Sequence, residues 1–141
     1  MARLVKIYDT TLRDGTQGEG VNFSMEDKVR IAKRLDQFGV HYIEGGWPGS
    51  NPKDVRFFQE MQGVTLKSAK LASFGSTRKP NTAAASDSNL QRLVESRTAV
   101  TTIYGKSWDF QVHEALNTTL EENLAMIADS VKFLLPHFEE V

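Results

Sequence analysis

The sequence predicts an α/β fold in which four β-strand and α-helix units follow one another and form a parallel sheet. Three observations support this prediction. Short apolar runs alternate with amphipathic helical patterns along all 141 residues. The helical segments have recognisable capping residues at their ends. A polar or glycine-containing cluster follows each expected strand, which is where binding sites form in parallel α/β folds.

The composition indicates one globular domain and excludes several functional classes. Hydrophobic residues make up 40% and charged residues 25% of the chain, and the net charge of −1 does not indicate a nucleic-acid partner. No apolar run reaches the roughly 18 residues of a membrane span, and the N-terminus lacks a signal-peptide pattern. The absence of cysteine excludes disulfides and thiolate chemistry. We therefore expect a cytoplasmic protein that binds neither nucleic acid nor membrane.

The first unit begins with residues 4–8, a mostly apolar run that we expect to be a strand buried on both faces. Residues 9–17 follow it and place Arg13 between two carboxylates, Asp9 and Asp14. Charged groups at the end of a buried strand are costly unless a metal or a substrate pairs with them. Because Asp-Gly is also an ordinary turn signal, these residues alone leave a binding site and a solvated turn as alternatives.

The first helix is predicted to begin after Ser24, with Asp27 completing a capping box, and to end at Gly39. Its expected apolar side consists of Val29, Ile31, Ala32, Leu35 and Phe38.

The second unit pairs a strand at residues 40–44 with a helix capped by Asn51, with Pro52 at its first position, and ended by Gly63. Its expected apolar face consists of Val55, Phe58 and Met61.

The third strand is predicted at residues 70–75, and Asp87 or Ser88 caps the helix after it, which carries Leu90, Leu93 and Val94.

The fourth strand is predicted at residues 99–104 and is followed by a loop and a short helix through Glu114. Thr119 and Glu122 form a second expected capping box before a last helix that Pro136 interrupts. The apolar face of this helix, expected in the core, is formed by Leu120, Leu124, Ile127, Val131 and Leu134.

Four motifs resemble one enzyme family. Residues 8–17 (YDTTLRDGTQ) are similar to the first-strand signature of the DRE-TIM metallolyases, which include 2-isopropylmalate, homocitrate and citramalate synthases, HMG-CoA lyase and biotin-dependent carboxyltransferases. Residues 42–52 (YIEGGWPGSNP) resemble the second strand and loop of the citramalate synthases of the long, isopropylmalate-synthase-like type. Residues 74–78 and 104–109 fit the same subgroup, and the resemblance extends from about residue 4 to the end.

The resemblance implies a TIM (β/α)₈ barrel, of which residues 1–141 would be the N-terminal part of the catalytic domain, its first four βα units. It also implies an acyltransferase that condenses acetyl-CoA with pyruvate, in a Claisen-type reaction, to give citramalate for branched-chain amino-acid biosynthesis. The implied cofactor is a divalent metal, Mg²⁺ or Mn²⁺, with Zn²⁺ or Co²⁺ also compatible. The alternatives within the family are a 2-isopropylmalate or homocitrate synthase and a C–C lyase similar to HMG-CoA lyase.

By the same resemblance, Asp14 is a metal ligand, and Arg13 is a catalytic residue that polarises the carbonyl of the 2-oxo acid. Gln17 lines the substrate pocket, and Glu44 is a catalytic and substrate-binding residue at the end of the second strand. Arg78 and Lys106 could contact substrate or CoA, or could be solvated loop residues.

The sequence departs from the family at its His-x-His pair of metal ligands. No such pair occurs, since the histidines are His41, His113 and His137. We therefore expect this chain to be inactive by itself, as part of a longer enzyme or as a catalytically dead half-barrel that serves as an assembly module.

Four βα units would leave two open sheet edges, and open edges favour pairing with another chain. We therefore predict that the chain forms a dimer or larger homo-oligomer, in which two copies could close one eight-stranded barrel. Size-exclusion chromatography with light scattering measures its molar mass in solution. A monomer at all concentrations would contradict this prediction.

Overall fold

The computed structural model describes residues 4–141 as an α/β fold with one parallel sheet in the order β1-β2-β3-β4. The strands are β1 (Tyr8–Asp9), β2 (Tyr42–Gly46), β3 (Lys70–Ser76) and β4 (Val100–Tyr104). The α-helices are α1 (Met25–Phe38), α2 (Pro52–Met61), α3 (Ser88–Glu95), α4 (Asp109–Glu114) and α5 (Leu120–Leu134). The predicted α/β fold class with a parallel sheet of four strands is confirmed.

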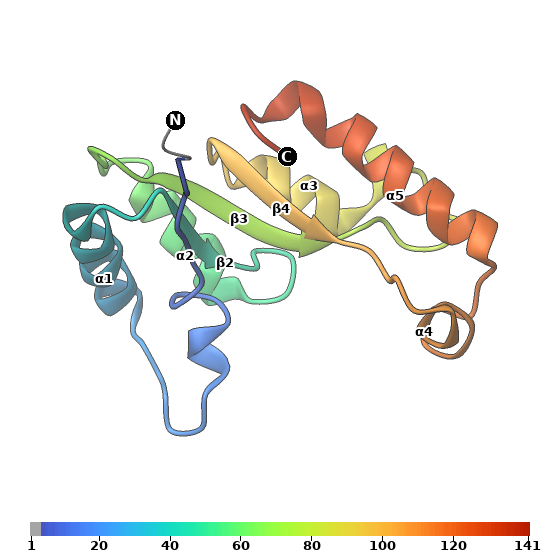
Figure 1. Cartoon of the computed structure of the whole chain (residues 1–141), viewed down its shortest axis with the longest axis horizontal. Coiled ribbons are helices and arrows are strands. Elements are labelled where there is room, and N and C mark those ends of the chain that lie inside the picture. Colours follow the sequence, from blue (N-terminus) through green and yellow to red (C-terminus); the bar gives the residue numbers. More distant parts are fainter. Residues whose placement is uncertain (1–3) are drawn as a thin grey trace.

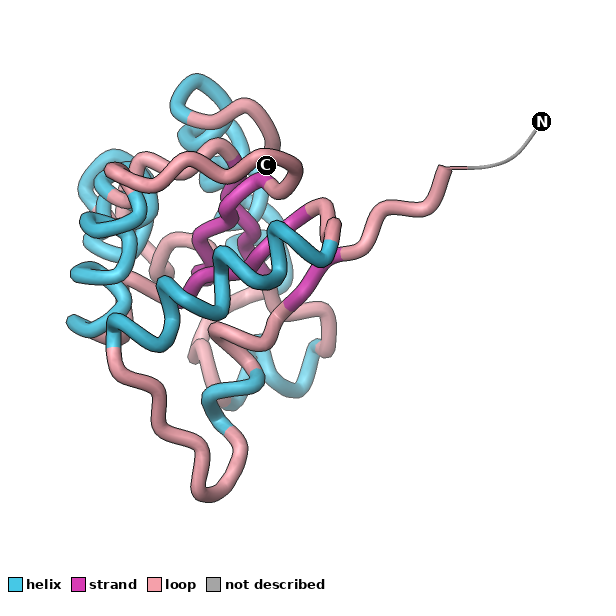
Figure 2. The backbone as a smooth tube through the Cα atoms, turned by 90° about the vertical axis from the view of Figure 1, so that its left-hand side faces the viewer, coloured by secondary structure: helices cyan, strands magenta, loops and turns pink. Residues whose placement is uncertain are grey.

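The helices form a layer on one face of the sheet, whereas the loop after β4 carries α4 away from it (Figure 1). Figure 2 shows the same layering from the side. The core lies between the two layers in two clusters. The larger cluster joins β2 to α1 and α2 through Ile43, Ala32 and Phe57, and the smaller one joins Leu90 and Leu93 of α3 to Leu134 of α5. None of the helices in residues 4–141 is long and apolar enough to cross a membrane.

The helix ends follow the predicted capping rules in most cases. Ser24 and Asp27 form the expected capping box, and Gly39 ends α1 in the left-handed conformation at φ 90°. Asn51 caps α2, and Asp87 rather than Ser88 caps α3.

The second expected capping box is only half formed. The Thr119 side chain accepts a hydrogen bond from the backbone N–H of Glu122, but the Glu122 carboxylate binds Arg78 instead of returning to Thr119.

The first strand is shorter and more exposed than predicted. It covers Tyr8–Asp9 instead of residues 4–8, and Leu4 and Val5 are 77% and 71% exposed. The reason is that β1 lies at the edge of the sheet with β2 as its sole neighbour in the described chain, and pairing begins only at Ile7. The segment before β1 consequently extends away from the sheet (Figure 2).

Two predicted helix faces were also partly wrong. Phe38 of α1 is 82% exposed, because the buried stripe of this helix runs through Lys28, Ala32 and Asp36. Leu124 of α5 is 66% exposed, because it lies outside the stripe of α5 that is buried against the sheet and α3. That stripe consists of Asn123, Met126, Ser130 and Leu134.

Asp36 is buried because it ties α1 to the loop that precedes β3. Its carboxylate accepts hydrogen bonds from the backbone N–H groups of Lys67, Ser68 and Ala69 at 2.8–2.9 Å. Burial raises the pKa of Asp36, but these three hydrogen bonds outweigh it and hold the pKa below its usual range. The ionised carboxylate therefore stabilises the folded chain.

We predict that Asp36→Asn lowers the free energy of unfolding at pH 7 by about 2 kcal/mol, because backbone donors lose a charged acceptor. Since the folded pKa lies below the unfolded value, this stabilisation is present above the unfolded pKa and is lost as pH falls through the folded pKa. Urea unfolding at pH 7 and below pH 3.8 should therefore show the difference from wild type narrowing in acid. Glu60→Gln, at an exposed position on α2, is the control. Equal losses in both variants would contradict the prediction.

Candidate active site at the carboxyl ends of the strands

Arg13, Asp14 and Glu44 meet at the carboxyl end of the sheet. Leu12 anchors the loop after β1 in the core and is fully buried, so Arg13 is held beside β2. The Arg13 Nε donates to Glu44 Oε1 at 2.5 Å, and Arg13 Nη1 donates to Asp14 Oδ1 at 3.0 Å. The side chains of Arg13, Asp14 and Glu44 are 20%, 60% and 2% exposed. The three predicted residues thus form one connected charge network.

The guanidinium of Arg13 also rests on an aromatic wall. Its Cζ lies 3.9 Å from the ring centroid of Phe74, a cation–π arrangement. Phe74 stacks on Tyr104 with a centroid separation of 5.6 Å, and Trp47 packs edge-on against both rings. Hydrogen bonds on one side and a ring on the other therefore fix the plane of the guanidinium.

Phe74 and Tyr104 were absent from the predicted site, because their placement follows from strand register as well as from the alternation of side chains along each strand. Side chains alternate between the two faces of a strand, and Glu44 pairs in register with Ala72. Phe74, two residues beyond Ala72, therefore points to the face that carries Glu44, and Tyr104 pairs with the next residue on that face, Ser76. The sequence does not reveal how β2, β3 and β4 pair in register, and this pairing is what brings Phe74 and Tyr104 to the site.

The backbone at the end of β2 is shaped by Asp54. The sheet register shifts between Glu44 and Gly46, and Gly46 has a φ of +152°. A Cβ on Gly46 would lie 2.4 Å from Asp54 Cγ. Asp54 accepts a hydrogen bond from the Trp47 backbone N–H at 2.8 Å and pairs with Lys28 at 2.5 Å. This buried ion pair fixes the loop that leads from Glu44 to Trp47.

Gln17 does not join the charge network. It is exposed at the end of a 3₁₀ turn, and its side chain makes no hydrogen bond to any residue in the range 4–141.

Arg78 serves the scaffold and is not a solvated loop residue. It is 5% exposed, and it donates to Glu122 at 2.7 Å and to Asp129 at 2.8 Å, which ties the loop after β3 to α5. Its hydrogen bond to Glu122 raises the pKa of Arg78. Lys106 differs from Arg78 in its burial and its contacts. It is half-buried, and its ammonium lies 5.5 Å from the ring centroid of Tyr104.

Asp14 has the chemistry of one metal ligand but does not form a complete site. Its second carboxylate oxygen has no hydrogen-bond partner within the described chain, and an exposed carboxylate is a hard donor suited to a divalent cation. No group of three or more His, Cys, Asp or Glu residues in the range 4–141 is placed to hold a metal ion. These residues therefore fit a metal only if further ligands come from elsewhere.

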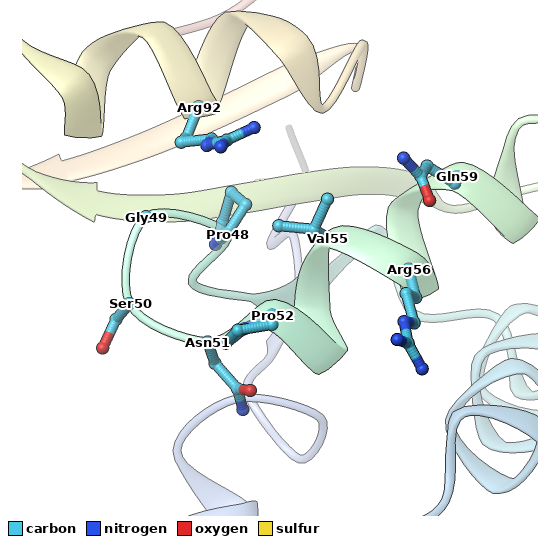
Figure 3. A pocket seen from close by; sticks show the side chains of 9 residues that line it. All are labelled: Pro48, Gly49, Ser50, Asn51, Pro52, Val55, Arg56, Gln59 and Arg92. Atoms are coloured by element: carbon cyan, nitrogen blue, oxygen red, sulfur yellow. The ribbon is translucent and has the colours of Figure 1, made fainter.

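A groove of the described chain lies outside this network. It encloses about 470 Å³ between the start of α2 and α3, and Figure 3 shows Arg92 above it with Val55 and Pro48 below. Arg92 is already paired with Glu95 at 2.7 Å. Because none of the predicted site residues lines this groove, we assign the candidate site to the strand ends.

A family model described as HMGL-like matches residues 4–137. An (R)-citramalate synthase of Aquifex aeolicus is 57% identical to all 141 residues, which correspond to 27% of that protein. A 2-isopropylmalate synthase of Brevibacillus brevis is 31% identical over 99% of this chain and 26% of its own length. The chain thus spans about a quarter of the length of the curated relatives it matches.

A solved hydroxymethylglutaryl-CoA lyase from Pseudomonas aeruginosa has the same fold in 43% of its chain. The match covers 94% of the present chain with a TM-score of 0.70 at 18% sequence identity. This similarity, together with the four parallel strands in sequential order, confirms the predicted half of a TIM barrel.

We predict that Gly46→Ala destabilises the chain by about 1–3 kcal/mol, because the added Cβ would collide with the buried Asp54 carboxylate. Urea unfolding followed by tryptophan fluorescence measures the change. Gly63→Ala is the matched control, since its Cβ would meet only the Glu60 carbonyl oxygen, at 3.7 Å. A Gly46→Ala variant as stable as the wild type would show that the loop after β2 is not held in this way.

Proposed function

The chain belongs to the HMGL-like family, the group that its DRE-TIM motifs resemble, and from this membership we propose that its protein condenses acetyl-CoA with pyruvate to give citramalate. A base removes a proton from the acetyl methyl group of acetyl-CoA, and the resulting enolate carbon forms a carbon–carbon bond with the keto carbon of pyruvate. The electron pair of the carbonyl moves to the keto oxygen, which becomes an alkoxide and then takes a proton. Hydrolysis of the thioester releases CoA.

The proposal depends on the hydrogen-bond donors of Arg13, at the exposed edge of its guanidinium, that are unused within residues 4–141. A guanidinium has five N–H donors, and Arg13 uses one on Glu44 and one on Asp14. Its Nη2 makes no hydrogen bond within the described residues, and a fifth of the side chain is exposed. Preorganised donors that face a developing negative charge are an effective stabiliser of a transition state. We assign Arg13 to the keto oxygen of the 2-oxo acid.

Glu44 and Asp14 support this role from two sides. Glu44 is buried and holds Arg13 through Nε, which leaves the outer edge of the guanidinium free for substrate. Asp14 would hold a divalent metal, Mg²⁺ or Mn²⁺, which would supply positive charge beside the same oxygen. Gln17 is exposed at the end of the 3₁₀ turn after Asp14, and we propose that it lines the substrate pocket.

The preference for pyruvate over a branched 2-oxo acid is supported by identity: 57% to the citramalate synthase of Aquifex aeolicus against 31% to the 2-isopropylmalate synthase of Brevibacillus brevis. We also propose that residues 1–141 form the N-terminal part of a barrel catalytic domain in a cytoplasmic, self-associating enzyme. Acetyl-CoA and a small 2-oxo acid are its proposed partners.

The test uses a chimera in which this chain replaces the matching 141 residues of the Aquifex aeolicus enzyme. CoA release from acetyl-CoA is measured with pyruvate and Mn²⁺, and with 3-methyl-2-oxobutanoate as the competing acceptor. We expect turnover with pyruvate in the chimera and none in the chain alone, because residues 4–141 contain no group of three or more side chains placed to hold a metal ion. A folded chimera that is inactive, or that prefers the branched acceptor, would refute the proposal.

We predict that Arg13→Lys lowers kcat of the chimera about 10²–10³-fold, because a lysine keeps the charge but loses the planar donors aimed at the oxygen. The matched control is Arg30→Lys on α1, where the arginine is exposed and pairs with Asp27 on the same helix. Similar kinetics in the two variants would remove Arg13 from the catalytic machinery.

A further inference from the structure

Tyr8 and Thr102 connect two further strands to Glu44. The Tyr8 hydroxyl donates to Glu44 Oε2 at 2.7 Å, and Tyr8 Oη lies 2.8 Å from Thr102 Oγ1. Tyr8 belongs to β1, Glu44 to β2 and Thr102 to β4, so one chain of hydrogen bonds crosses the concave face of the sheet. This series of hydrogen bonds ends at Arg13, whose Nε donates to the other carboxylate oxygen of Glu44.

The direction of each hydrogen bond follows from the donors available. An ionised carboxylate can only accept, so the single hydroxyl proton of Tyr8 points to Glu44. Thr102 must then donate its own proton to Tyr8 Oη. Burial raises the pKa of Tyr8, which keeps the phenol protonated and able to donate. The three groups therefore have one consistent arrangement.

Glu44 depends on this arrangement because it is 2% exposed and water cannot replace a lost donor. Its Oε1 is bound by Arg13 and its Oε2 by Tyr8, one donor for each oxygen. A buried carboxylate oxygen without a partner is costly, and the side chain would rotate to find another donor. Any rotation of Glu44 moves the group that fixes Arg13.

We propose that Tyr8 and Thr102 are positioning residues that hold Glu44, and through it Arg13, in the orientation that presents the guanidinium to substrate. Among the described residues, neither hydroxyl hydrogen-bonds to the guanidinium, so both act through Glu44. The functional meaning of this device rests on the proposed role of Arg13, but the contact itself can be measured without turnover.

The test follows the Nε–H group of Arg13 by ¹H–¹⁵N NMR in this chain. In the wild type we expect a shifted, slowly exchanging signal. In Tyr8→Phe we expect solvent exchange to be faster by about tenfold or more, because the hydrogen bond to Glu44 loosens. Tyr42→Phe is the matched control, since Tyr42 pairs with Tyr8 in register but its hydroxyl binds Glu140. An Arg13 signal unaffected by Tyr8→Phe would overturn the proposal.

Thr102 supplies a second pair of variants in case Tyr8→Phe does not fold. Thr102→Ser keeps the hydroxyl and loses a methyl group, whereas Thr102→Val keeps the shape and loses the hydroxyl. A positioning role predicts rapid Arg13 exchange in Thr102→Val and near-wild-type exchange in Thr102→Ser. A purely packing role predicts the reverse order and would refute the proposal.

The chimera connects the contact to the reaction. We expect Tyr8→Phe and Thr102→Val to lower kcat about tenfold with little change in KM for acetyl-CoA, and Thr102→Ser to restore kcat. If the NMR signals change as expected but the chimera is inactive throughout, the proposed function fails while the positioning contact stands. If the chimera is active and kcat is unchanged in all three variants, the positioning role is refuted while the proposed function stands.

Discussion

The candidate site depends on one constraint, which is that the buried carboxylate of Glu44 must be satisfied on both oxygens. Its environment excludes water, so the donors have to come from the protein. Arg13 and Tyr8 provide them, and Thr102 completes the pairing of Tyr8. Because these groups come from β1, β2 and β4, satisfying one carboxylate also links strands that are not neighbours in the sheet. The curvature of the sheet and the geometry of the site are therefore connected.

In the helices and loops that cover the sheet, buried charged side chains are likewise paired by groups of the protein. Asp36 satisfies three backbone donors before β3, Asp54 joins Lys28 to the loop after β2, and Asp87 caps α3 while accepting from the Lys79 backbone. Arg78 ties the loop after β3 to α5. Buried charges in this fold therefore fasten loops to helices, and the loops in turn set the strand ends at which the site lies.

Membership of the HMGL-like family is consistent with a site at the strand ends that is supported by the surrounding helices. The carboxyl ends of the strands carry Arg13, Asp14 and Glu44, and the helices on the outer face supply the rigid support behind them (Figure 1). In barrels of this kind chemistry is built from the loops at one end, so the scaffold and the site can be analysed separately. Arg13 stands at their junction, held by Glu44 and Phe74 and open on its remaining edge.

The βα order, most helix caps and the first-strand cluster could be predicted from the sequence, because these depend on local periodicity and on residues close in the chain. The sequence also placed Arg13, Asp14 and Glu44 at strand ends. The side chains that surround these residues are set by the packing of the sheet. Phe74 and Thr102 reach the site through strand register. Phe38 and Leu124 are exposed because other residues, several of them polar, form the buried stripes of α1 and α5. Pairing between residues 30 to 100 positions apart is a property of the packed sheet and leaves no trace in local sequence.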